Sequence, residues 1–126
     1  DVLGALYVSD PKYNVDMFIG IGGGPEGVLA ACALDAYDCH FQGRFIFDNE
    51  KNIKEANSMG IKDLTKKYEI NEIVNGDSLF CATGITSSDI LSGISKDNNT
   101  YASETLVTHK SSNYKKIVSK IMSLDE

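Results

Sequence analysis

The sequence predicts an α/β domain in which a mixed sheet is layered with flanking helices. Short apolar runs bounded by turn residues alternate with helix-forming segments along the chain. Of the 126 residues, 42% are hydrophobic and 24% are charged, a balance typical of a folded globular domain. No internal repeat or long linker divides the chain. We therefore expect a single domain over residues 1–126, with a mostly parallel or mixed sheet.

Helix signals occur in four places, and residues 1–8 fit either a helix or a strand. The strongest signal covers residues 27–37, where Pro25 and Glu26 precede a run of small and apolar residues. Proline at a helix start needs no amide donor, and a first-turn glutamate complements the helix dipole. Gly60 is placed to end a polar helix over residues 50–59. Residues 70–74 predict a short helix, and residues 113–124 place four apolar side chains on one helical face.

Five segments predict strands, namely residues 15–21, 41–47, 67–69, 78–83 and 100–109. Residues 84–93 predict a loop, and residues 96–99 a tight polar turn. Cys32 and Cys81 lie in apolar runs and are expected to be buried. Three cysteines without a CxxC pair argue against a disulfide framework or a structural zinc site, and they fit a cytoplasmic location.

Charge and hydropathy exclude several classes of partner. The net charge is −6 and no basic stripe interleaves with aromatic residues, so nucleic acid is not expected as a partner. No apolar run reaches the roughly 20 residues that span a membrane. The start at Asp1 has neither an initiator methionine nor a basic segment, which favours a cut inside a longer protein over a signal peptide.

The turn Gly22–Gly27 is the most informative segment, because it joins a predicted buried strand to a helix N-terminus. Ligands of open α/β sheets bind at such places, and glycines allow phosphate oxygens to approach backbone amides. The same residues satisfy G-x-G-x-x-G, and Asp48 follows at the spacing of a dinucleotide-binding motif. Pro25 removes one amide, however, and Glu26 would repel a pyrophosphate. A carboxylate there suits Mg²⁺ or Mn²⁺, or it simply caps the helix.

In its order of motifs the chain resembles the C-terminal part of the GlpX-type, or class II, fructose-1,6-bisphosphatases. The matching segments are Ile21-Gly22-Gly23-Gly24-Pro25-Glu26-Gly27-Val28-Leu29-Ala30-Ala31, Phe41-Gln42-Gly43-Arg44, Met59-Gly60-Ile61, Gly76-Asp77, Phe80-Cys81-Ala82-Thr83-Gly84-Ile85-Thr86, Gly93 and Thr105-Leu106-Val107. The last segment departs from the family, which is extended where residues 112–122 look helical.

This resemblance implies the layered sandwich fold of the fructose-1,6-bisphosphatase and inositol monophosphatase group, with this chain as its C-terminal half. It implies that Glu26 is a ligand of Mn²⁺ or Mg²⁺ and that Gly23 and Asp1 bind substrate. The catalytic residues and most metal ligands are then expected in an N-terminal half. The implied reaction removes the C1 phosphate of fructose 1,6-bisphosphate in gluconeogenesis and glycerol metabolism, in a cytoplasmic homo-oligomer. Sedoheptulose 1,7-bisphosphate stays open as a further substrate.

Under the same resemblance we expect the isolated chain to be inactive, and a non-catalytic phosphate- or metal-binding module is the alternative. The other polar candidates are expected to have surface, packing or turn roles. They are His40, His109, Arg44, Thr83 and Thr86. No Ser/His/Asp set has a spacing that predicts nucleophilic catalysis.

Overall fold

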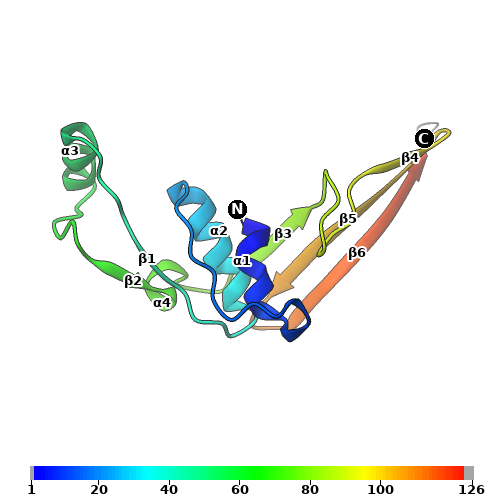
Figure 1. The fold of residues 1–126 in the computed structure, drawn as a ribbon, viewed down its shortest axis with the longest axis horizontal. Helices are drawn as coiled ribbons and strands as arrows, with labels where there is room; N and C mark the ends of the chain where they lie inside the picture. The colour runs from blue at the N-terminus through cyan, green and yellow to red at the C-terminus, as the bar shows by residue number, and fades with distance from the viewer. Residues whose placement is uncertain (1, 124–126) are drawn as a thin grey trace.

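The structure is a computed structural model that describes residues 2–123, and it has an open outline (Figure 1). The middle holds α1 (Val2–Ala5), the 3₁₀ turns η1 (Leu6–Ser9) and η2 (Pro11–Tyr13), and α2 (Gly24–Asp35). One arm carries β1 (Gln42–Arg44), α3 (Glu50–Ser58), β2 (Lys67–Glu69) and α4 (Ile70–Ile73). The other arm carries β3 (Leu79–Thr83), β4 (Ser95–Asp97), β5 (Thr100–His109) and β6 (Tyr114–Ser123). The predicted α/β class with flanking helices is confirmed.

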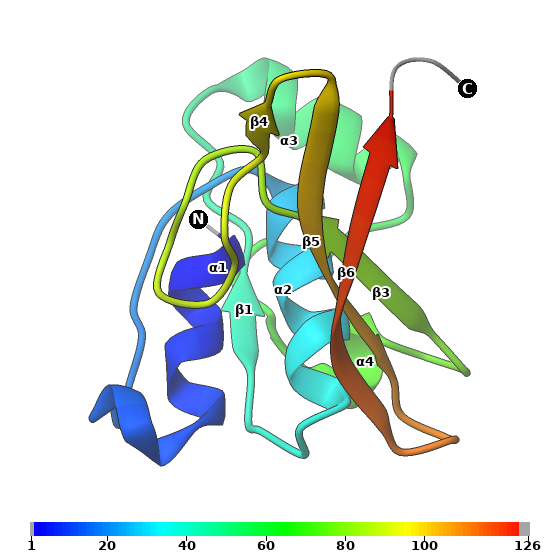
Figure 2. The same ribbon diagram turned by 90° about the vertical axis from the view of Figure 1, so that its right-hand side faces the viewer.

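The strands form two separate sheets (Figure 2). In the smaller sheet β1 pairs with β2, and in the larger one β5 pairs with β3, β4 and β6. Every pair among the described strands is antiparallel, so the parallel pairing suggested by the alternation of helices and strands is wrong. In the larger sheet the chain returns through tight turns, at Asn98 and Asn113, whose positive φ values of 48° and 50° suit asparagine.

The predicted helix over residues 113–124 is also wrong, because β6 occupies this segment. Its residues pair in register with β5 over ten positions, from His109↔Tyr114 to Thr100↔Ser123. Tyr114, Ile117, Val118 and Ile121 match helical spacing, but β-branched and aromatic residues also favour strands. The hairpin partner decides between the two. The segment is extended, so the supposed departure from the family at this point disappears.

Two further strand predictions need correction. Residues 15–21 form no strand: they run as exposed coil, and Ile19 and Ile21 are 85% and 87% exposed. The strand expected over residues 41–47 shrinks to β1, since β2 offers partners only from Lys67 to Glu69. In both cases the apolar residues lack a neighbouring strand within the described part of the chain.

The helix ends follow the local sequence signals closely. Helix α3 begins after Asn49, whose side chain accepts a hydrogen bond from the Asn52 amide at 2.9 Å. It ends before Gly60, which has a φ of +88°. In α4, Glu69 and Glu72 form a capping box. These signals are local, so they could be identified without tertiary information.

The buried core is small and lies where α1 and α2 meet β3 and β5. It contains Phe80, Leu91 and Leu106 together with Ala5 of α1, Leu6 of η1, and Ala30, Ala33 and Leu34 of α2. Small side chains on α2 allow α1 to approach closely. Cys32 is only half-buried and Cys81 is exposed, contrary to expectation. Cys81 follows Phe80 on β3, and the alternation of a strand turns it to the other face.

Candidate metal and phosphate site

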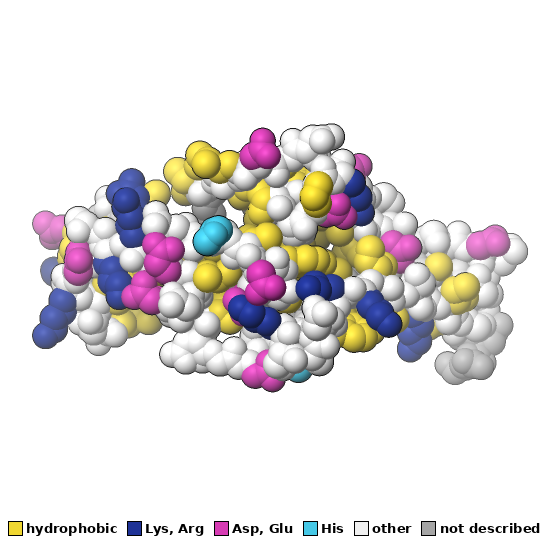
Figure 3. All heavy atoms as spheres, turned by 90° about the horizontal axis from the view of Figure 1, so that it is seen from below, with side chains coloured by type: hydrophobic (Ala, Val, Ile, Leu, Met, Phe, Trp, Pro, Cys, Tyr) yellow, Lys and Arg dark blue, Asp and Glu magenta, His cyan; other side chains and the backbone are white. Residues whose placement is uncertain are grey.

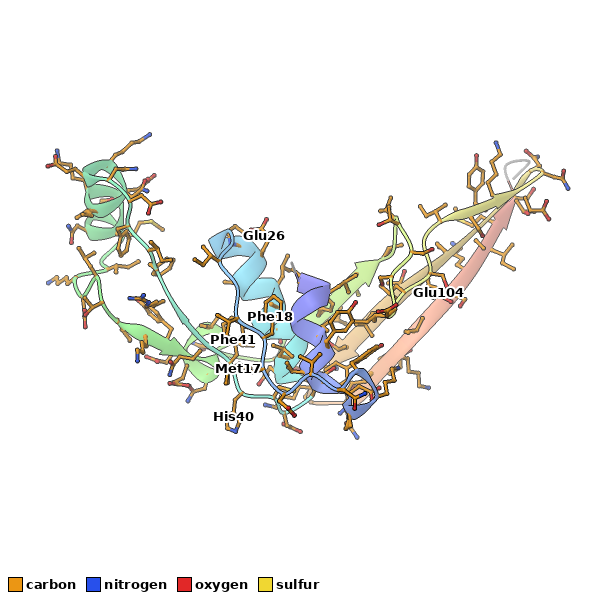
Figure 4. The ribbon with its side chains drawn as sticks, in the orientation of Figure 1. Met17, Phe18, Glu26, His40, Phe41 and Glu104 are labelled. Carbon is orange, nitrogen blue, oxygen red and sulfur yellow. The ribbon has the colours of Figure 1, made fainter. Side chains whose placement is uncertain are left out.

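The N-terminus of α2 presents the predicted site residues at an exposed end of the helix (Figure 4). Gly23 is the N-cap residue, with an extended backbone (φ −67°, ψ 148°), and Glu26 lies in the first turn. The Gly27 amide donates to the Gly23 carbonyl oxygen at 3.1 Å, which closes that turn. Helix geometry leaves the earlier amides of Gly24 and Glu26 without an intrahelical acceptor, and Pro25 has no amide hydrogen. Two amides are thus available to an anion.

The carboxylate of Glu26 folds back over Gly23. A Cβ atom added at Gly23 would clash with the Glu26 Oε2 atom, so only glycine leaves this oxygen its position. The backbone of Gly23 does not itself require glycine, because its φ is negative. Glycine at position 23 is therefore compatible with this position of the Glu26 carboxylate, which an added side chain would force to move. The predicted residues Gly23 and Glu26 lie together, whereas Asp1 lies outside the described residues.

One carboxylate is a suitable but incomplete ligand set for a hard divalent cation. Mg²⁺ and Mn²⁺ favour oxygen ligands, and Mg²⁺ demands six in octahedral geometry. Residues 2–123 contain no group of three or more His, Cys, Asp or Glu side chains close enough to share a metal ion. The Glu26 carboxylate could fill one position in such a coordination sphere, and a complete site would need further ligands from outside residues 2–123.

The structure does not support a dinucleotide site at this turn. The motif requires a strand that leads directly into the glycine turn, and residues 15–23 contain none. The match to G-x-G-x-x-G is therefore a coincidence of composition.

The remaining polar candidates lie apart from Glu26 or bind other protein groups. His40 is exposed and lies below α2 in Figure 4, away from Glu26 at the upper end of this helix. The hydroxyl of Thr83 lies 2.8 Å from that of Thr105 across the sheet. Arg44 and Thr86 are exposed, on β1 and in the loop after β3. None of these observations indicates a role in binding.

One polar cluster was missed by the sequence analysis. His109 Nε2 lies 3.0 Å from the Asp77 carboxylate, and His109 Nδ1 lies 2.8 Å from the Ser112 hydroxyl. Hydrogen bonds from Ser111 and His109 lower the pKa of Asp77. Lys110 reaches Asp35 of α2 at 2.7 Å. Together these contacts tie the β5–β6 turn to its neighbours, and the β5–β6 register that creates them was not predicted.

None of the helices within residues 2–123 has the length and apolar content of a membrane span. Comparison with known proteins then decides the family. The model of the family described as bacterial, glpX-encoded fructose-1,6-bisphosphatase matches residues 1–122. The chain belongs to this family.

Curated relatives agree with this assignment. A D-fructose 1,6-bisphosphatase class 2/sedoheptulose 1,7-bisphosphatase of Trichormus variabilis is 36% identical over 107 residues, covering 75% of this chain and 31% of the relative. Proteins of the same name from two strains of Prochlorococcus marinus are each 33% identical over 121 residues, covering 85% of this chain and 36% of the relative. The chain thus spans about a third of the length of these glpX-family relatives.

Proposed function

We propose that this chain is the C-terminal part of a metal-dependent phosphatase that removes the C1 phosphate of fructose 1,6-bisphosphate. Membership of the glpX family and the names of the relatives support this reaction. The single observation that supports the assignment of a site is the exposed Glu26 carboxylate, which lies over Gly23 at the start of α2. Sedoheptulose 1,7-bisphosphate is a second substrate, as the relatives' names suggest.

In this proposal Glu26 contributes one carboxylate to a site for Mn²⁺ or Mg²⁺ whose other ligands come from an N-terminal part. The bound metal would activate a water molecule and offset charge on the phosphate oxygens. The amides of Gly24 and Glu26 face outward at the positive end of the helix dipole, where they suit oxygen atoms of a sugar phosphate. Gly23 binds substrate through its backbone, and its missing side chain keeps the Glu26 carboxylate in position.

The exposed apolar surface supports a longer protein. Met17, Ile19 and Ile21 before α2, and Phe45 and Ile46 after β1, are all at least 46% exposed. Patches of this kind usually mark an interface. The relatives are about three times as long as this chain. An N-terminal part that makes up the remaining length would bury these apolar side chains.

The test is the activity of the full-length product of the reading frame that contains this chain. Purified protein is assayed for phosphate release from fructose 1,6-bisphosphate with Mn²⁺ or Mg²⁺. We expect Glu26→Gln to lower kcat/KM by at least about a hundredfold, since loss of a charged ligand should exceed the effect of losing a supporting residue. The isolated 126-residue chain should show negligible turnover.

Glu50→Gln is the matched control. Glu50 is likewise an exposed glutamate in the first turn of a helix, α3, so its replacement removes the same dipole interaction. It should leave kcat/KM within about twofold, the scatter expected of an exposed surface change. Equal activity of Glu26→Gln and wild type would reduce Glu26 to a helix-capping charge. A reading frame that begins near Asp1 would instead favour a non-catalytic binding module.

A further inference from the structure

Strand β6 forms a long, free edge of the larger sheet. It takes one edge of β5 over ten positions, so β3 and β4 share the other edge of β5. No strand within residues 2–123 pairs with the outer edge of β6, which lies along the lower margin of the right-hand arm (Figure 1). A long strand with a free edge offers a row of backbone donors and acceptors to another strand.

The side chains of β6 are exposed on both faces of the sheet. Nine of its ten residues are exposed, and its apolar members are between 44% and 75% exposed. The register with β5 puts Ile117 and Ile121 on the face that carries Leu106, and Val118 and Met122 on the other face. Figure 3 shows apolar side chains beside Lys or Arg side chains on the underside of this arm, at the right of the view. A further strand at this edge would extend both faces at once.

Charge restricts which strand can pair here. Strand β6 contains three lysines and no acidic residue. Lysines on an edge strand usually oppose pairing, because like charges directly opposite each other are destabilising. Whether a second copy of β6 can occupy the edge therefore depends on the register in which two antiparallel copies meet.

Most registers of two antiparallel β6 strands are unfavourable. Each symmetric register is centred on one residue that lies opposite its own copy, and each face stays continuous. Centred on Val118, the pairing would place Lys116 opposite Lys120 of the second copy. Centred on Lys120, it would place this lysine opposite itself. Centred on Ile117, it would leave Ile121, which is 75% exposed, beyond the paired segment.

The register centred on Ser119 avoids these conflicts. It covers residues 116–122 of both copies, and no lysine lies directly opposite another. Its pairs are Ile117 with Ile121, Val118 with Lys120, and Lys116 with Met122. Each pair occurs twice, so the strand is complementary to itself, as a twofold-symmetric interface requires.

We propose that β6 pairs antiparallel with β6 of a second copy of this chain, in the register centred on Ser119. The two larger sheets then form one continuous sheet across the dimer. Backbone hydrogen bonds along the edge and the isoleucine pairs on one face stabilise this interface. It goes beyond the proposed phosphatase activity and does not depend on it.

The first test is cysteine cross-linking of the full-length protein under mild oxidation. Residues directly opposite each other on antiparallel strands have Cβ atoms about 4.5–5.5 Å apart, close to the span of a disulfide. We expect Ser119→Cys to give a covalent dimer on a non-reducing gel, and Val118→Cys to cross-link more slowly. Ser95→Cys is the matched control, because Ser95 is an exposed serine of β4, on the opposite side of β5. It should stay uncross-linked, as should wild type with its exposed Cys81.

The second test is the dissociation constant of the full-length dimer in sedimentation equilibrium. Ile121→Lys puts a charge opposite Ile117 of the second copy, and should weaken the dimer at least about tenfold through the lost apolar contact. Met59→Lys is the control, because Met59 is 76% exposed, against 75% for Ile121, and follows α3 away from the larger sheet. It should change the constant by less than about twofold.

The lysines give this dimer a characteristic response to charge. Lys120 lies diagonally across from Lys116 of the second copy, so added salt should strengthen the dimer by screening their repulsion. Lys120→Glu should also strengthen it, at least about twofold, because the diagonal contact becomes attractive. Lys96→Glu, on β4, should have no effect.

The alternative occupant of the edge is an acidic segment of the N-terminal part. In that case Lys120→Glu would not strengthen a dimer, and Ser119→Cys would not cross-link. Either result would overturn the proposal. A monomeric full-length protein, faster cross-linking of Val118→Cys than of Ser119→Cys, or equal effects of Ile121→Lys and Met59→Lys would also overturn it.

Discussion

Among single residues, Gly23 offers the most direct test of the site geometry. Its backbone is compatible with alanine, yet a Cβ atom there would displace the Glu26 carboxylate. We expect Gly23→Ala to raise the Mn²⁺ concentration needed for half-maximal activity of the full-length protein at least about tenfold, with little change in thermal stability. Gly22→Ala meets open space and should have a smaller effect. Equal effects of the two changes would contradict this steric account.

Replacement of Thr108 by an apolar residue of the same shape should raise the free energy of unfolding. Its side chain is 1% exposed, and its hydroxyl has no hydrogen-bond partner among the described residues. A buried unpaired hydroxyl is costly, so Thr108→Val should raise the free energy of unfolding by about 1 kcal/mol in urea denaturation. Thr105→Val is the matched control, because the Thr105 hydroxyl bonds to Thr83 at 2.8 Å and its removal should destabilise. A stability loss in Thr108→Val would indicate a partner that this structure does not contain.

At the scale of elements, the β5–β6 turn should make stability depend on pH. Hydrogen bonds from Ser111 and His109 lower the pKa of Asp77 below its ordinary value of 3.8. A carboxyl whose pKa is lower in the folded state contributes stability above its unfolded pKa, and loses it as the pH falls through the folded pKa. Asp77→Asn should therefore lower the urea midpoint at pH 7. The difference from wild type should shrink as the pH falls below about 4.

Asp63→Asn provides the comparison for this experiment. The pKa of Asp63 is lowered by hydrogen bonds from Thr65, two residues away, so its contacts are local and connect no separate elements. We expect a smaller change in the urea midpoint than for Asp77→Asn. A difference for Asp77→Asn that stays constant from pH 7 to pH 3 would mean that the ionised carboxylate is not its cause.

Elements with local signals could be predicted, and elements decided by their partners could not. Pro25, Glu26 and Gly60 mark helix ends through backbone geometry that depends only on neighbouring residues. The segment that forms β6 has apolar residues at helical spacing but of types that favour strands, and only its hairpin with β5 decides. Likewise, the sequence predicted Glu26 and Gly23 as site residues and the structure places them together, but the carboxylate over Gly23 is visible only in three dimensions.

At the scale of the whole molecule, the open outline explains why several apolar residues that we expected to be buried are exposed. The two arms diverge from α1 and α2, and the core lies only where the helices meet the larger sheet. Apolar residues predicted to be inside, such as Ile19, Ile21 and Cys81, are exposed because residues 2–123 offer nothing to cover them. Hydropathy predicts that such residues will be buried somewhere. It does not identify the surface that buries them.

This exposed surface should make the isolated chain associate. Ile19 and Ile21 are among its most exposed apolar residues, and burial of apolar area stabilises association by about 25 cal/mol per Å². In sedimentation velocity we expect the 126-residue chain to form species larger than a monomer at micromolar concentration. Ile19→Ser with Ile21→Ser should shift it toward monomer. The control, Lys51→Ser with Lys54→Ser, alters exposed residues of α3 and should leave the distribution unchanged. If the wild-type chain is monomeric at all concentrations, these exposed apolar residues do not drive association. They would then no longer be evidence for the proposed N-terminal part.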